Sequence, residues 1–93
     1  MEQHVDVLDM GPHEYGVTIT EGTETTYHRV IVPERLIDDL GLVEVDERDL
    51  VRESMDYLLD RVPVDSVAHE VDLAELADEH TDYSEEILAR LSG

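Results

Sequence analysis

The sequence predicts an α+β domain in which a three-stranded antiparallel meander is followed by three or four helices packed on one face. Three observations lead to this prediction. Apolar residues alternate along 15–20, a short glycine turn joins this run to a second strand-like run, and a capped amphipathic helix occupies 45–63. The chain of 93 residues has the length of one domain, which we assign to 1–93, with strands over about 4–32 and helices over 33–93.

The predicted strands follow one another with short connections. A first apolar run at 5–8 ends at a Gly-Pro pair, which breaks regular structure. Residues 15–20 then alternate Tyr, Val and Ile with Gly and Thr, which is the period of a half-buried strand. The turn EGTE at 21–24 leads into TTYHRVIV at 25–32, a run rich in strand-favouring residues. Two such runs joined by a glycine turn predict a hairpin.

The helices are marked by residues at their ends. Pro33 precedes a short helix and Gly41 follows it, positions that helices favour for these residues. In VDERDLVRESMDYLLDRVP, Asp46 is the expected N-cap and Pro63 ends the helix. After a connection at 62–71, two short helices are expected to begin at Asp and Glu pairs of the capping type. The expected core consists of Val17, Ile19, Val30, Val32, Leu36, Leu40, Leu50, Val51, Met55, Leu58, Val62, Leu73, Leu76, Ile87 and Leu91.

The charge composition is extreme. There are 25 acidic and 6 basic residues, giving a net charge of −19, and every basic residue is Arg. On the outer surface of the central helix, like-charged residues four apart outnumber opposite pairs, so that surface is neutral or slightly unfavourable in dilute salt. Molar salt reduces the screening length to about 3 Å. The acidic surface without Lys therefore resembles that of cytoplasmic proteins from salt-accumulating haloarchaea. The alternative is an acidic surface that binds a basic partner.

Several classes of protein are disfavoured by this composition. We expect a cytoplasmic protein without a signal peptide or membrane span, because no apolar run approaches about 20 residues. Nucleic-acid binding is not expected, since a strong negative field repels phosphates and no basic patch is visible. Without Cys, neither disulfides nor thiolate metal sites are available.

The sequence contains no compelling catalytic or cofactor-binding motif. The five histidines, at 4, 13, 28, 69 and 80, lack H-x-x-x-H or H-E-x-x-H spacing, so we assign no metal site or cofactor. Ser54 is interpreted as a small residue at the core edge of the central helix. No G-x-S-x-G or phosphate-loop pattern occurs, so no catalytic residue is assigned.

An exposed strand edge is the most informative candidate site. If the strand 25–32 is an outer strand of the meander, its backbone is free to pair with another chain. We assign this interaction surface to Thr26, His28 and Val30. The partner would be a second copy, giving a homodimer, or an extended peptide.

Three function classes remain open. The first is a non-enzymatic protein-interaction module that can form a homodimer. The second is an acidic inhibitor or antitoxin-like partner of a basic protein. The third is a small metal-assisted enzyme that uses the histidines.

The stretch ERDLVRESMDYLLDRVPVDSV at 47–67 resembles a group of small uncharacterised prokaryotic proteins. These have a β N-terminus, a helix of the type LVxxSxxFLLxRxP and then short helices. Leu50, Val51, Ser54, Leu58, Leu59, Arg61 and Pro63 match this pattern, whereas Tyr57 occupies the position of its Phe. The resemblance implies the α+β fold and no activity.

Overall fold

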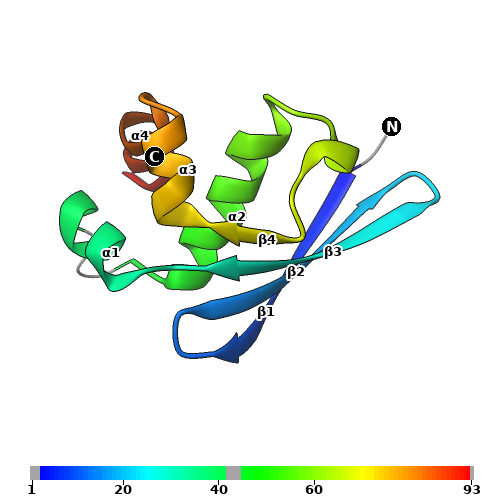
Figure 1. The fold of residues 1–93 in the computed structure, drawn as a ribbon, viewed down its shortest axis with the longest axis horizontal. Coiled ribbons are helices and arrows are strands. Elements are labelled where there is room, and N and C mark those ends of the chain that lie inside the picture. The colour runs from blue at the N-terminus through cyan, green and yellow to red at the C-terminus, as the bar shows by residue number, and fades with distance from the viewer. Residues whose placement is uncertain (1–2, 42–44, 93) are drawn as a thin grey trace.

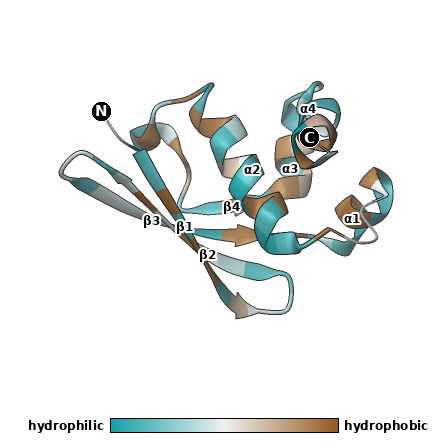
Figure 2. Ribbon diagram, turned by 180° about the vertical axis from the view of Figure 1, so that it is seen from behind, coloured by the Kyte–Doolittle hydropathy of each residue, from teal (hydrophilic) through white to brown (hydrophobic). Residues whose placement is uncertain are grey.

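A computed structural model describes residues 3–41 and 45–92 of the domain predicted at 1–93. Positions 1–2, 42–44 and 93 lie outside the described residues. Figure 1 shows the helices gathered on one side of a twisted sheet, and Figure 2 shows the same arrangement from behind. The elements, in chain order, are β1 (Gln3–Gly11), β2 (Glu14–Glu21), β3 (Glu24–Ile31), α1 (Glu34–Leu40), α2 (Glu47–Leu59), the 3-10 turn η1 (Val64–Ser66), β4 (Glu70–Asp72), α3 (Leu73–Glu79) and α4 (Tyr83–Ser92).

The sheet confirms the predicted antiparallel meander and adds a strand to it. The strand order is β1-β2-β3-β4, and both β1/β2 and β2/β3 pair antiparallel. The short β4 pairs parallel with β3 through Arg29↔Glu70, Val30↔Val71 and Ile31↔Asp72. The prediction of three strands is therefore wrong in number: the sheet formed by the described residues has four strands and is mixed. Strand β4 begins in the stretch 62–71, which was predicted to be a connection, and ends at Asp72, which was predicted to cap the next helix.

The first two helices have the predicted ends. Pro33 stands at the N-cap of α1, and Gly41 closes it with φ of 66°, in the left-handed region. At the start of α2, the Asp46 carboxylate accepts a hydrogen bond from the backbone N–H of Arg48 at 2.9 Å. The helix ends at Leu59, shortly before Pro63, as the local restriction by proline requires.

The two C-terminal helices begin differently. The Asp72 carboxylate accepts from the N–H groups of Ala74 and Glu75, so it caps α3 as predicted. Asp82 precedes α4, but its carboxylate accepts instead from the hydroxyl of Tyr57 and the guanidinium of Arg61. The second capping signature is thus used for a tertiary contact between α2 and the start of α4.

The core lies between the sheet and the helix layer. The predicted core residues are buried except for Leu40, Val62 and Leu91, which are partly buried. Tyr15, Tyr57 and Tyr83 are also buried, although they were not predicted to be. Each of these tyrosines has a hydrogen-bond partner for its hydroxyl, which removes the main penalty for burying it.

Candidate functional site

The strand-edge surface predicted at Thr26, His28 and Val30 is not an exposed edge. Strand β4 pairs with β3 here, and the N–H of Arg29 donates to the carbonyl of His69 at 2.7 Å. Val30 is fully buried and His28 is 7 % exposed, because both face the helix layer. Strand β3 is therefore not the outermost strand where β4 pairs with it, at 29–31, and all three residues lie on the inner face, with Thr26 only partly buried.

Both ring nitrogens of His28 form hydrogen bonds within the fold. Its Nδ1 donates to the carbonyl of Ala68 at 2.7 Å, and its Nε2 lies 2.9 Å from the hydroxyl oxygen of Thr26. Because the carbonyl can only accept, the proton in this bond is on Nδ1, and Nε2 forms the second hydrogen bond with the Thr26 hydroxyl. His28 therefore ties the segment before β4 to β3.

The other histidines do not form a common centre either. His13 bridges Glu47, at 2.9 Å, and Glu34, at 3.5 Å, and so connects the β1–β2 turn to the starts of two helices. His4 lies 3.1 Å from Asp6 on the same strand. In residues 3–41 and 45–92, no group of three or more His, Cys, Asp or Glu side chains is arranged to hold a metal ion.

The sheet has a face on which no helix of the described chain lies, and we call it the outer face (Figure 1). It carries the even-numbered residues of β1 and β2 and the odd-numbered residues of β3, which are paired across the strands. Three of its large apolar side chains are exposed: Leu8 by 68 %, Met10 by 58 % and Tyr27 by 64 %. Several large apolar side chains exposed on one face are a feature of docking surfaces rather than of folding.

A groove crosses the outer face above Gly16. Leu8, Gly16 and Arg29 lie opposite one another in the register of β1, β2 and β3. A β-bulge between Asp9 and Gly11 inserts Met10, and a Cβ atom on Gly16 would lie only 2.8 Å from the Met10 Sδ. The groove has a volume of about 470 Å³ and is bordered by Met10, Gly16, Val17, Tyr27, His28, Arg29, His69 and Glu70.

The charges beside this groove are internally paired. The Arg29 guanidinium donates two hydrogen bonds of 2.9 Å to the Glu14 carboxylate and lies 3.5 Å from Glu70. The hydrogen bonds from Arg29 hold the pKa of the Glu14 carboxyl below its usual value, and Glu14 in turn raises the pKa of Arg29. The pairs are exposed, so they contribute little to stability. They do leave the groove close to neutral on a chain of charge −19.

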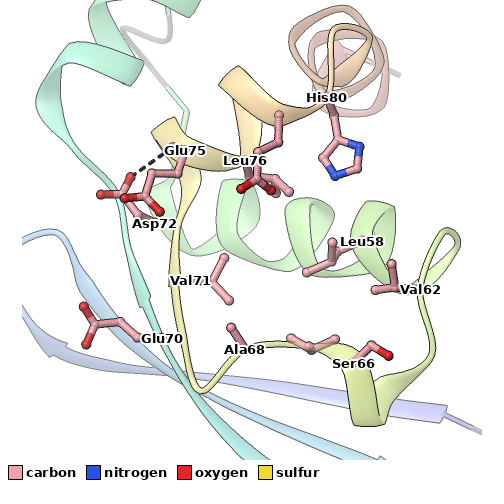
Figure 3. A pocket seen from close by; sticks show the side chains of 12 residues that line it. Leu58, Val62, Ser66, Ala68, Glu70, Val71, Asp72, Glu75, Leu76 and His80 are labelled. Atoms are coloured by element: carbon pink, nitrogen blue, oxygen red, sulfur yellow. Dashed lines mark hydrogen bonds between the residues drawn. The ribbon is translucent and has the colours of Figure 1, made fainter.

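A second cavity, of about 240 Å³, lies between α2, α3 and the segment that leads into β4 (Figure 3). Leu58, Val71 and Val62 line its apolar part. Figure 3 shows the carboxylates of Asp72 and Glu75 at one end and the ring of His80 at the other. Residues 66–68, Glu70, Leu76 and Glu79 complete the lining. We call this cavity the acidic cleft.

The acidic cleft offers carboxylates beside an apolar surface. Asp72 is engaged in capping α3, whereas Glu75 and Glu79 stand one helical turn apart on that helix and offer carboxylate oxygens. The apolar lining could accommodate an aliphatic stem, with a cationic head at the carboxylates. No Arg borders the cleft in the described residues.

A buried polar network connects α2 to α4. The hydroxyls of Ser54 and Tyr83 lie 2.6 Å apart, and the Tyr57 hydroxyl donates to Asp82 at 2.5 Å. The guanidinium of Arg61 lies 3.6 Å above the ring of Tyr57. Burial raises the pKa of Tyr57 and of Tyr83 to about 12, so neither hydroxyl ionises near neutral pH.

This network corrects the interpretation of Ser54. The residue is completely buried rather than at the edge of the core. It is the hydrogen-bond partner that allows Tyr83 to be buried. Ser54 therefore stabilises the fold, and its hydroxyl has no access to a substrate.

The outer-face residues Leu8, Met10, Gly16 and Tyr27 were not singled out from the sequence. One signal existed: Leu8 follows Val7 directly, so an apolar residue falls on the face opposite to that of Val5 and Val7. A glycine in the interior of a strand was a second signal, because it often marks a close approach of another group.

Comparisons with protein-family models, curated proteins and solved structures give no match for this chain. Among the described residues, none of the helices has the length and apolar character needed to cross a bilayer.

Proposed function

We propose that this protein is a non-enzymatic interaction module that self-associates, two copies joining through their outer faces. The main support is the exposure of Leu8, Met10 and Tyr27 together on a sheet face that carries no helix in the described structure. A fold of two layers needs only the inner face of its sheet to be apolar. The exposed parts of large apolar side chains on the opposite face have no role in the packing of one chain.

The face is a better docking surface than the free edge at β1. The β1 edge carries Asp6, Asp9 and a bulge next to Met10. Charged residues and bulges are devices by which edge strands avoid pairing with other chains. The outer face also carries Asp6, but Gly16, between Leu8 and Arg29 in the register, has no side chain and leaves the neighbouring apolar groups accessible.

A second copy suits the patch better than a strongly basic partner does. The groove is near neutral, because Arg29 is paired with Glu14 and Glu70. Of the outer-face carboxylates, Glu14 and Glu70 are paired with Arg29, and Asp6 lies 3.1 Å from His4, so the carboxylates that two such patches bring together each have a partner. A basic partner docked here would instead place its cations against Leu8 and Tyr27.

The dimer is proposed to form in molar salt, in the cytoplasm of a salt-accumulating cell. Two copies of charge −19 repel each other, and this repulsion is screened at high ionic strength. The thermal midpoint of unfolding should rise steadily from dilute to molar KCl. A flat or falling midpoint would count against the halophilic interpretation and in favour of an acidic surface made for a partner.

Light scattering in molar KCl tests the self-association. We expect a concentration-dependent mass that approaches twice that of one chain. Leu8→Ser should weaken the dimer by about tenfold or more, since a buried Leu contributes about 1.5–3 kcal/mol. The matched control is Leu88→Ser, which alters an exposed Leu on α4 and should leave the dimer unchanged. A wild-type chain that remains monomeric at every concentration would rule out the proposal.

The acidic cleft supports a second candidate, an inhibitor-like partner of a basic protein. Glu75 and Glu79 flank an apolar cavity that no Arg of the described chain borders. The test is copurification from the native host in salt that preserves the fold. A basic protein should be retained by wild type and lost with the double variant Glu75→Gln/Glu79→Gln. Equal retention by both proteins would contradict this candidate.

A further inference from the structure

The glycine at position 16 is not required by the backbone. Only Gly11, Gly22 and Gly41 among the described glycines have positive φ, so Gly16 adopts a conformation open to any residue. A glycine inside a strand is less stable than alanine by about 0.5–1 kcal/mol. Since the neighbouring outer-face positions of β2, Glu14 and Thr18, both carry side chains, what Gly16 provides is the absence of a side chain on that face.

The side chain of Met10 lies over the space left by the missing side chain of Gly16, but it covers that space only in part. The bulge in β1 adds Met10 to the strand, and bulges commonly redirect a side chain. Its sulfur lies where a Cβ of Gly16 would make a 2.8 Å contact, yet Met10 as a whole is 58 % exposed. Methionine is flexible and adapts to different neighbours. Met10 can therefore move aside without disturbing the core.

We infer that the groove over Gly16 is a socket for the Leu8 side chain of a second copy, with Met10 as its adjustable wall. This inference rests on the self-association proposed above. Leu8 is the most exposed of the three large apolar side chains on the outer face and is the cross-strand neighbour of Gly16.

Symmetry makes this contact reciprocal. Neighbouring strands are about 4.8 Å apart, so Leu8 and Gly16 stand side by side. A two-fold axis that runs along the strands, midway between β1 and β2, brings each Leu8 over the Gly16 of the other copy. One apolar knob and one socket per chain then form an isologous interface.

Two variants test the socket through the dissociation constant of the dimer in molar KCl. Gly16→Ala adds a methyl group at the floor of the groove, on the exposed side of the sheet, and should weaken the dimer about tenfold with the fold intact. Leu88→Ala changes an exposed apolar residue of α4, outside the outer face, and should leave the dimer unchanged. A Gly16→Ala dimer as tight as wild type would overturn the inference.

A measurement on the wild-type protein provides an independent check. Hydrogen peroxide transfers one oxygen atom to the Met10 sulfur, giving the sulfoxide and water. We expect the rate of this oxidation to fall as protein concentration, and hence the dimer fraction, increases. A dimer in which Met10 reacts as fast as in the monomer would overturn the socket while leaving self-association in place. A chain that never dimerises would overturn both.

Discussion

The two faces of the sheet carry similar apolar side chains in opposite situations. On the inner face, Tyr15, Val17 and Ile19 are buried beneath the helices, and the Tyr15 hydroxyl donates to Glu47 at 3.2 Å. On the outer face, Leu8 and Tyr27 remain about two-thirds exposed. Burial on the inner face stabilises the single chain, whereas apolar area on the outer face stabilises nothing until something covers it. The comparison separates residues that fold the molecule from residues that we propose join it to a second copy.

The largest expected effect is on the inner face. Ile19→Ala should lower the free energy of unfolding by about 2–5 kcal/mol, because it leaves a cavity at a fully buried position. Leu8→Ala should change it by no more than about 0.5 kcal/mol when measured on the monomer. Denaturant unfolding of dilute protein compares the two directly. Equal losses would mean that the outer face also contributes to the core.

The polar network under the helices gives an effect of intermediate size. Ser54→Ala leaves the buried Tyr83 hydroxyl without its partner and should lower the free energy of unfolding by about 1–3 kcal/mol. Replacing both members, as Ser54→Ala/Tyr83→Phe, should recover part of this loss, since no buried polar group is then unsatisfied. If the double variant loses the full sum of the two single losses, the hydroxyls do not interact as the structure indicates.

A smaller effect is expected on the acid dependence of stability, and it also allows the helix layer to be compared with the sheet. Hydrogen bonds from Tyr57 and Arg61 lower the pKa of the Asp82 carboxyl below its ordinary 3.8. A lowered carboxyl pKa stabilises the folded chain above the unfolded value, and this stability is lost as pH falls through the folded value. The thermal midpoint should therefore fall less steeply below about pH 4 in Asp82→Asn than in wild type.

The outer-face carboxyl of Glu14 is the matching control for this titration. Its pKa is lowered by Arg29 in the same direction, but it lacks a buried tyrosine donor. Glu14→Gln should reduce the fall of the thermal midpoint below about pH 4 by less than Asp82→Asn does. The opposite order would show that ion pairing on the outer face matters more for folding than the helix-layer network.

Local signals in the sequence were sufficient for much of the fold. The alternation along β2, the capping aspartates at 46 and 72, and the glycine at 41 each act on a few neighbouring residues. Strand β4 could not be predicted this way. Its three residues carry no period, and they form a strand only because β3, about 40 residues earlier in the chain, presents an open edge to them.

Local sequence signals were also insufficient to predict the interactions between charges in the helix layer. Counting residues four apart on α2 predicts repulsion between Asp49 and Glu53 and between Asp56 and Asp60. In the folded chain, Arg90 of α4 lies 2.9 Å from Asp60 and 3.9 Å from Glu53. One arginine from a distant segment therefore offsets part of the repulsion, which a count within one helix cannot include.

The candidate site was the least predictable part. Thr26, His28 and Val30 were chosen on the assumption that β3 is an outer strand, and β4 removes that assumption. The outer patch depends on the register that brings Leu8 opposite Gly16, and on a bulge that directs Met10 over it. Neither the register nor the bulge can be derived from apolar periodicity alone.

The central claim is that the inner face folds the chain and the outer face joins two copies. The most direct test is the thermal midpoint of wild type and of Leu8→Ser in molar KCl, each measured over a wide range of protein concentration. Association stabilises the folded state by mass action, so the wild-type midpoint should rise with concentration. The midpoint of Leu8→Ser should stay flat and equal that of dilute wild type. Two flat curves, or two curves that rise in parallel, would contradict the account.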